Sequence, residues 1–259
     1  MREVIRVEGV SKSFTFPALK GVSFSAMPGE FLSIVGPSGC GKSTLLRIIS
    51  GLTPAHEGQV WVEGERIIGL NRKVGFVFQR DALLPWKTVY ENIILSHLFK
   101  GSERERADAE TRSWIDIVGL RGFENHYPGQ LSGGMRKRAA LAQVMISGSS
   151  IILMDEPFGA LDVQTRDIIE NELLRIWQEF KKTIVFVTHD LEEAISLSDR
   201  VIVLTAAPGR VKGEYRVELP RPRNVIEVRF LDEFRTIYQK IWSDLREEVL
   251  ASYEAGRKR

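Results

Sequence analysis

The segment Gly36-Pro37-Ser38-Gly39-Cys40-Gly41-Lys42-Ser43-Thr44 carries the most informative pattern in this chain. It fits Gly-x-x-x-x-Gly-Lys-Ser/Thr, the pattern of a phosphate-binding loop. The preceding run Phe31–Val35 has strand composition, and residues 42–50 predict a helix that Gly51 ends. This context suits phosphate binding, because the glycines let successive backbone N–H groups point at phosphate oxygens and the helix N-terminus adds positive charge. We expect Lys42 to reach the β- and γ-phosphates and the Ser43 hydroxyl to hold Mg²⁺.

Composition indicates a packed globular protein. The chain has 259 residues, of which 43% are hydrophobic, and its net charge is +2. That balance gives no indication of a nucleic-acid partner, and we expect none. The single cysteine excludes an internal disulfide and suits a reducing compartment. The N-terminus lacks the apolar core of a signal peptide, and no apolar run approaches the roughly 20 residues that cross a bilayer, so we expect a soluble protein whose membrane role needs a partner chain.

The apolar pattern divides the chain into a core and an insertion. Residues 151–154 and 183–187 are continuous apolar runs, as in parallel strands that are buried on both faces. From about residue 80 the pattern becomes helical, with helices expected over 89–99 and 102–118. We predict a core of residues 1–79 and 148–232, a helical subdomain of residues 80–147, and a C-terminal amphipathic helix and tail over 233–259. The basic end Arg257-Lys258-Arg259 is expected to be solvated.

Polar residues follow several of the predicted strands. Asp155-Glu156 comes after an apolar run, where carboxylates face the ligand crevice of an open α/β sheet. Asp155 is expected to hold Mg²⁺, and Glu156 to orient and deprotonate an attacking water. His189 and Gln79 also end strands, so His189 could reach a γ-phosphate and the Gln79 amide could bind Mg²⁺ and water. The alternative for a lone histidine is a structural role.

A second anion site is indicated by Leu131-Ser132-Gly133-Gly134-Met135, which opens a helix expected over residues 135–145. Arg136, Lys137 and Arg138 crowd the first turn, where the helix dipole disfavours cations, and a docked anion would explain them. The alternative is a capped helix with a solvated basic face.

Taken together, these residues resemble the ATP-binding subunit of an ABC transporter. Residues 36–44 look like its Walker A motif, Ile151–Glu156 like Walker B, and Leu131–Met135 like the signature sequence. Gln79 resembles the Q-loop glutamine, Gly159-Ala160-Leu161-Asp162 the D-loop, and His189 the switch histidine. Phe14 matches the aromatic residue that stacks on adenine, with Phe16 as a competing candidate.

The resemblance implies an α/β fold with a phosphate-loop (RecA-like) core, a mainly parallel sheet, an N-terminal antiparallel β subdomain and an inserted α-helical subdomain. It implies an ATPase that uses ATP and Mg²⁺, and a head-to-tail homodimer in which each ATP lies between one phosphate loop and the other subunit's signature helix. The implied nucleotide contacts are Phe14, Gly36, Pro37, Ser38, Gly39, Cys40, Gly41, Lys42, Ser43, Thr44, Gln79, Ser132, Gly133, Gly134 and Asp162; the metal contacts are Ser43, Gln79 and Asp155; the catalytic residues are Lys42, Gln79, Glu156 and His189.

A narrower resemblance is to importers of nitrate, sulfonates, taurine and related small solutes. It rests on Phe78–Trp86, on Met135, and on residues 207–210 and 219–223. It implies integral membrane permease subunits, an external solute-binding protein, and a peripheral location on the cytoplasmic face of the inner membrane. The apolar loop Leu83–Trp86 is expected to be exposed and to dock a short helix of the permease; the alternative is a loop that faces the core. The chain departs from the family pattern at Lys137, commonly Gln, and Gln143, commonly Arg, which is expected to alter the packing or interface of the signature helix.

Cys40 is the only cysteine and lies inside the phosphate loop. Backbone N–H groups, the helix N-terminus and Lys42 would lower the pKa of its thiol, which predicts a reactive side chain that Mg-ATP protects from maleimide. The alternative is a side chain that points into the core and is inert.

Other classes remain as alternatives. An exporter ATPase of the same superfamily would share these motifs, but the Leu83–Trp86 loop favours import. A soluble ABC ATPase that acts on DNA or ribosomes usually carries a long coiled-coil insert or two nucleotide-binding units, and this chain has neither. A phosphate-loop kinase or GTPase has no use for a Leu-Ser-Gly-Gly helix. The transported solute is not encoded in any of these motifs.

Overall fold

The computed structural model describes residues 2–80 and 82–257, and side chains as far as residue 254. Asp81 and the basic tail expected to be solvated therefore lie outside the described residues or side chains. The elements in chain order are β1 (Ile5–Ser13), β2 (Pro17–Ala26), β3 (Phe31–Val35), α1 (Lys42–Ile49), β4 (Glu57–Val62), β5 (Glu65–Arg66), β6 (Val74–Val77), α2 (Val89–Ile93), α3 (Leu95–Lys100), α4 (Arg104–Ile117), η1 (Pro128–Gln130), α5 (Gly133–Met145), β7 (Ile151–Asp155), α6 (Val163–Phe180), β8 (Thr183–Val187), α7 (Leu191–Leu197), β9 (Arg200–Leu204), β10 (Val211–Arg216), η2 (Glu227–Phe230) and α8 (Asp232–Arg257).

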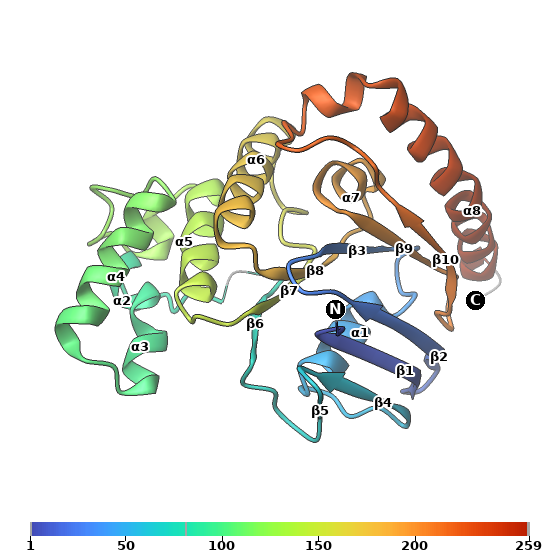
Figure 1. The fold of residues 1–259 in the computed structure, drawn as a ribbon, viewed down its shortest axis with the longest axis horizontal. Coiled ribbons are helices and arrows are strands. Elements are labelled where there is room, and N and C mark those ends of the chain that lie inside the picture. Colours follow the sequence, from blue (N-terminus) through green and yellow to red (C-terminus); the bar gives the residue numbers. More distant parts are fainter. Residues whose placement is uncertain (1, 81, 258–259) are drawn as a thin grey trace.

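Two sheets form the body of the molecule. A six-stranded sheet has the order β10-β9-β3-β8-β7-β6, in which only the pairing of β10 with β9 is antiparallel. A four-stranded antiparallel sheet has the order β2-β1-β4-β5 and lies against it, with α1 between them (Figure 1). The expected α/β fold, with its mainly parallel core sheet, N-terminal antiparallel sheet and helical insertion, is confirmed.

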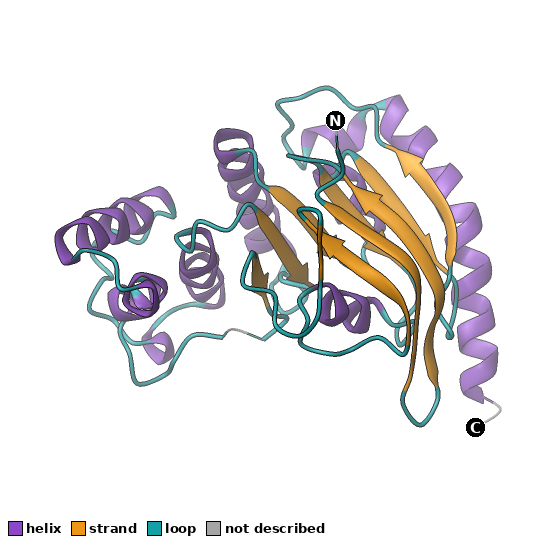
Figure 2. Cartoon of the chain, turned by 60° about the horizontal axis from the view of Figure 1, so that its bottom comes forward, coloured by secondary structure: helices purple, strands orange, loops and turns teal. Residues whose placement is uncertain are grey.

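The central strands are apolar throughout because both of their faces are covered. Phe31 and Phe186 pack with α6 and the helices of the insertion. Their sequence neighbours Leu32 and Val185, which pair with each other in the sheet, pack with α1 and the antiparallel sheet. Alternate residues of a strand point to opposite faces, so each strand supplies side chains to two separate cores. Figure 2 shows the helices on either side of the strands.

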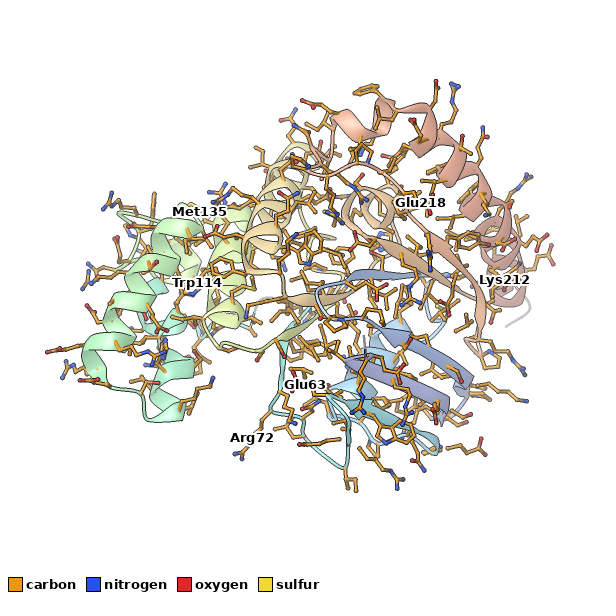
Figure 3. The ribbon with its side chains drawn as sticks, in the orientation of Figure 1. Glu63, Arg72, Trp114, Met135, Lys212 and Glu218 are labelled. Atoms are coloured by element: carbon orange, nitrogen blue, oxygen red, sulfur yellow. The ribbon has the colours of Figure 1, made fainter. Side chains whose placement is uncertain are left out.

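Helices α2 to α5 form the insertion between β6 and β7, which projects from one end of the molecule (Figure 1). The single helix expected over 89–99 is divided at Ile94 into α2 and α3. The helix expected from residue 135 begins at Gly133, since Ser132 is its N-cap. Trp114 of α4, labelled in Figure 3, packs against Phe180 of α6 in a tilted arrangement with 4.9 Å between ring centroids, and this contact joins the insertion to the core.

The C-terminal helix α8 crosses the outer side of β9 and β10 (Figure 1). It buries Phe234, Ile241 and Leu245 against these strands, as its amphipathic pattern predicts. Lys212 of β10 (Figure 3) anchors it through ion pairs with two glutamates of the helix, at 2.6 and 2.9 Å. Among the described helices, none combines the length and apolar composition needed to span a membrane.

Candidate functional site

The predicted site residues follow neighbouring parallel strands of the large sheet. The phosphate loop follows β3, His189 follows β8, and Asp155 ends β7 with Glu156 next to it. Gln79 lies two residues beyond β6. Since these strands are adjacent in the order β3-β8-β7-β6, their carboxyl ends bring the side chains to one edge of the sheet.

The phosphate loop has the backbone shape that its glycines permit. Gly39 and Gly41 have φ angles of 78° and 99°, in the left-handed region. A Cβ on Gly41 would also lie 2.8 Å from the Ala18 carbonyl oxygen, so this position requires glycine. The buried Lys42 ammonium donates to the carbonyl oxygens of Gly36 at 2.8 Å and Pro37 at 3.1 Å. The Lys42 side chain therefore lies across the loop and bonds to backbone oxygens at its start.

Ser43 and Asp155 place two oxygen ligands side by side. The Ser43 hydroxyl donates to Asp155 Oδ1 at 2.7 Å. Burial raises the pKa of the Asp155 carboxyl above its usual value, while the Ser43 hydrogen bond opposes that shift. A nearby divalent cation would stabilise the charged carboxylate that burial disfavours, and hydroxyl and carboxylate oxygens are the ligands that Mg²⁺ takes. The pair therefore fits a Mg²⁺ site.

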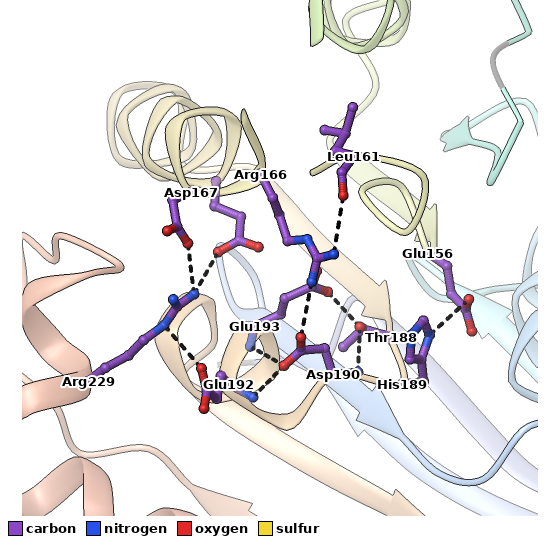
Figure 4. Close-up of polar contacts among 11 residues, drawn as sticks. Glu156, Leu161, Arg166, Asp167, Thr188, His189, Asp190, Glu192, Glu193 and Arg229 are labelled. Atoms are coloured by element: carbon purple, nitrogen blue, oxygen red, sulfur yellow. Dashed lines mark hydrogen bonds and ion pairs between the residues drawn. The ribbon is translucent and has the colours of Figure 1, made fainter. Parts of the chain in front are cut away.

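Glu156 is the residue on which the other polar side chains converge. Its Oε2 lies 3.1 Å from His189 Nδ1 and 3.3 Å from Gln79 Nε2, and its Oε1 lies 3.9 Å from Lys42 Nζ. Its backbone φ of 43° is unusual for a residue other than glycine, a conformation that costs about 1–3 kcal/mol. Its N–H donates to the Val187 carbonyl at 2.9 Å, which fixes the strained turn. Figure 4 shows the contact between Glu156 and His189.

The expectation of a reactive thiol at Cys40 is wrong. The side chain is 0% exposed and packs in the apolar core with α1 and β3, as the alternative reading held. Burial raises the pKa of the thiol, and this effect outweighs the lowering by Lys42. The loop turns the side chain at this position into the core, so a contact of Cys40 with a nucleotide would involve its main chain.

The N-terminus of α5 is capped and its cations are paired. The Ser132 hydroxyl accepts from the Met135 N–H at 3.3 Å. Arg136 donates to the Leu131 carbonyl at 2.7 Å and Lys137 to the Gln79 carbonyl at 2.9 Å, while Arg138 pairs with Glu172 at 3.1 Å. The helix is capped, as the alternative held, but its basic residues do not form a solvated face. Because they bond within the chain, they also do not need a docked anion to explain them. In the described part of the chain, none of the hydrogen bonds joins this helix N-terminus to the phosphate loop.

Gly134 has a packing reason to be glycine. A Cβ at this position would lie 2.8 Å from the Thr165 side chain, so the glycine lets α5 approach α6 closely. Asp162 caps α6 by accepting from the Thr165 N–H at 2.9 Å, and this bond lowers the pKa of the Asp162 carboxyl. The Asp162 side chain is exposed, as is that of Ser132. The structure thus places two exposed helix caps next to each other on the surface of the core.

The remaining candidates lie outside this cluster. Phe14 and Phe16 both project into solvent from the turn between β1 and β2, so exposure does not distinguish them as adenine-stacking residues. The apolar loop after Gln79 is divided: Trp86 is 70% exposed, as expected, whereas Leu83 is only 8% exposed and packs in the core with α2 and α5. The expectation of an exposed Leu83 is wrong.

Sequence reasoning missed the positions that link these elements. Arg166 donates to the Leu161 carbonyl, just before Asp162, and to the Asp190 carboxylate, just after His189. Its signal was its place one helical turn after the Asp162 cap, which predicts a side chain near the same helix end.

Comparison with known proteins identifies the family. A family model described as "ABC transporter" matches residues 19–159, which is more than half of the chain. The chain belongs to the ABC transporter family. As a member it is an ABC ATPase, which binds and hydrolyses ATP. The matched segment contains the phosphate loop, Gln79, Asp155 and Glu156, whereas His189 lies beyond it.

The similarity extends well beyond the matched segment. An uncharacterised ABC transporter ATP-binding protein of Methanocaldococcus jannaschii is 46% identical over 97% of this chain and 95% of its own length. An aliphatic sulfonates import ATP-binding protein of Bacillus cereus is 40% identical over 97% of this chain and 96% of its own length. A dimeric ATP-binding cassette solved in a post-hydrolysis state with ADP and phosphate superposes with a TM-score of 0.74 at 35% identity, covering 83% of this chain and all of that one.

Proposed function

We propose that this chain is the ATP-hydrolysing subunit of an importer that moves a small solute, such as a nitrate, sulfonate or taurine, through separate membrane subunits. The observation that carries the proposal is similarity over nearly the whole chain to a protein named for sulfonate import. This chain would be a peripheral protein on the cytoplasmic face of the inner membrane. There it would bind the permease subunits and drive their movement by hydrolysing ATP. An external solute-binding protein would deliver the solute.

The site residues divide the chemistry between them. The backbone of residues 36–44 and the Lys42 ammonium would bind the β- and γ-phosphates. Ser43, Asp155 and Gln79 would hold Mg²⁺, which neutralises phosphate charge when bound. Glu156 would orient the attacking water and accept its proton, and His189, already in contact with that carboxylate, would hold the γ-phosphate. Phe14 would stack on the adenine.

A second copy of the chain would complete each site. Ser132, Gly133 and Gly134 form a capped helix N-terminus whose backbone N–H groups would bind an anion, yet none of the hydrogen bonds among the described residues joins it to the phosphate loop of its own chain. A head-to-tail homodimer would bring this helix end and the exposed Asp162 to the nucleotide of the partner subunit. The dimeric state of the similar ADP-bound cassette supports this arrangement.

The loop after Gln79 would contact the permease. Trp86 exposes most of its surface, and a large exposed aromatic residue favours a protein interface. Gln79 lies just before the loop and donates to Glu156. Movement of the permease helix against Trp86 could therefore reach the catalytic carboxylate through a short stretch of backbone.

The Glu156→Gln variant tests the catalytic assignment. The amide keeps the shape of the side chain but cannot accept a proton, so steady-state ATP hydrolysis should fall by roughly 10²–10⁴-fold while ATP binding persists. Glu179→Gln, at an exposed position of α6, is the control and should hydrolyse ATP normally. Near-normal hydrolysis by Glu156→Gln would refute the assignment, and failure to co-purify with any integral membrane protein would refute the transport role.

A further inference from the structure

One guanidinium group connects the turn before α6 to the turn before α7. Arg166 Nη2 donates to the Leu161 carbonyl at 3.3 Å, and Nη1 donates to Asp190 Oδ2 at 3.2 Å (Figure 4). Leu161 immediately precedes Asp162, and Asp190 immediately follows His189. Arg166 therefore holds the neighbours of two residues that belong to the functional site, although its own side chain lies behind both.

The acceptors of Arg166 are themselves tightly held. Asp190 Oδ1 caps α7 by accepting from the backbone N–H groups of Glu192 at 2.9 Å and Glu193 at 3.3 Å. The Thr188 hydroxyl donates to Glu193 Oε2 at 2.6 Å and accepts from the Asp190 N–H at 2.9 Å. Glu193 in turn lies 3.6 Å from Arg166 Nη1. The residues on both sides of His189 thus belong to one hydrogen-bonded unit that is closed by Arg166.

Loss of this cation would disturb the unit rather than leave a local gap. The Glu193 side chain is buried, and burial raises the pKa of its carboxyl while Arg166 and Thr188 oppose that shift. Without Arg166, Asp190 would lose a charge-assisted bond and Glu193 would lose its nearest cation. Because both residues bond to the turn that carries His189, their rearrangement would disturb that turn.

We propose that Arg166 is a positioning residue that couples the Asp162 turn to the His189 turn and so sets the orientation of His189 towards Glu156. The planar fork of a guanidinium can bond two acceptors on different elements at fixed angles, whereas the ammonium of a lysine is a point charge on a flexible stem. Displacement of the Asp162 turn, for example by a partner subunit, would be passed through this fork to the imidazole. The inference rests on the role proposed above for His189.

The chain offers a matched control in Arg229 of η2. Arg229 pairs with Asp167 of α6 at 3.1 Å and with Glu192 of α7 at 3.6 Å, so it joins the same two helices (Figure 4). It contacts neither Leu161 nor Asp190 in the described structure. A variant at Arg229 therefore removes a half-buried cation from this helix pair without releasing the bonds from Arg166 to the turn that carries His189.

The experiment measures kcat and KM for ATP in Arg166→Gln, Arg166→Lys and Arg229→Gln, with thermal unfolding of each. We expect Arg166→Gln to lower kcat by at least about tenfold with KM changed less than about twofold, because misplacing a catalytic group costs rate rather than binding. Arg166→Lys should fall between Arg166→Gln and the unaltered chain, and Arg229→Gln should keep kcat within about twofold. Equal kcat losses at Arg166 and Arg229 would overturn the inference, since that is the pattern of a merely structural role.

A double variant separates this inference from the role proposed for His189. His189→Ala should be slow, and Arg166→Gln added to it should lower single-turnover hydrolysis no further, because Arg166 acts through the missing imidazole. Additive losses would overturn the inference. A fast His189→Ala would refute the role of His189 itself. NMR of the imidazole in Arg166→Lys provides a test without turnover: the His189 resonance should shift there and stay unchanged in Arg229→Gln, and an unchanged resonance in both would also overturn the inference.

Discussion

Replacing Glu170 with glutamine should change how the stability of this protein depends on pH. Glu170 lies on α6 and is 0% exposed. Burial raises the pKa of its carboxyl to about 9, the charge of nearby Glu193 adds to the shift, and the Arg229 cation, 3.6 Å away, opposes it. Asp167 and Asp190 also raise this pKa. We therefore expect the Glu170 carboxyl to be protonated and neutral at pH 7 in the folded chain.

The sign of the effect follows from proton linkage. In the unfolded chain the same carboxyl has its ordinary pKa of 4.5, so between pH 4.5 and about 9 the folded state keeps a proton that the unfolded state has released. The free energy of unfolding then falls as pH rises, by up to about 1.4 kcal/mol per pH unit for one proton. From pH 6 to pH 8 this amounts to at most about 2.7 kcal/mol. A glutamine, which does not titrate, removes this slope.

The assay is urea unfolding at pH 6, 7 and 8 of the unaltered chain, Glu170→Gln and the exposed-site control Glu179→Gln. The difference in unfolding free energy between Glu170→Gln and the unaltered chain should move in favour of the variant as pH rises, whatever its sign at pH 6. The control should run parallel to the unaltered chain. A gap between Glu170→Gln and the unaltered chain that is the same at all three pH values would refute the claim that Glu170 is protonated when folded.

Three further outcomes follow from the geometry. Maleimide should label Cys40 slowly in the native chain and quickly after unfolding, because the thiol is buried; complete labelling within minutes, measured by mass spectrometry, would contradict that placement. Lys42→Ala and Ser132→Arg should each be inactive alone and recover part of the ATPase activity when mixed, since a heterodimer has one intact composite site; normal hydrolysis by Ser132→Arg alone would exclude a site shared between subunits. Trp86→Ser should uncouple solute uptake and spare the ATPase activity of the isolated subunit; intact uptake in this variant would argue against docking at this loop. By contrast, Leu83→Ser should lower the unfolding free energy by about 2–5 kcal/mol, as for loss of a core leucine.

The site could be predicted where chemistry depends on the backbone and on the shared direction of parallel strands. The phosphate loop needs glycine at fixed positions, so residues 36–44 identify a strand, a turn and a helix at once. Asp155-Glu156 and His189 follow continuous apolar runs, and such runs indicate parallel strands. Since parallel strands have their carboxyl ends at one edge of the sheet, we could predict that these side chains converge without knowing which strands are neighbours.

Side-chain direction and local breaks could not be predicted in the same way. A loop pattern fixes the backbone at Cys40 but not which side of the loop faces the core, and the burial of the thiol depends on packing from distant elements. Leu83 and Trp86 are close in sequence and equally apolar, yet one fills a space beneath α2 and the other remains in solvent. The division of 89–99 at Ile94 could not be predicted either, because the apolar pattern of this segment runs through that position.

The departure of Lys137 from the family pattern gains its meaning from the contacts around Glu156. The sequence indicated only that a lysine here would alter how the signature helix packs, and the structure shows the Lys137 ammonium bonded to the Gln79 carbonyl at 2.9 Å. Gln79 in turn donates from its side chain to Glu156 at 3.3 Å. One chain of contacts thus runs from the Glu156 carboxylate through Gln79 to α5, and another runs through His189 towards Arg166 and α6. Because both α5 and α6 begin with exposed caps, a partner that docked at either helix end would be linked through these contacts to the same carboxylate.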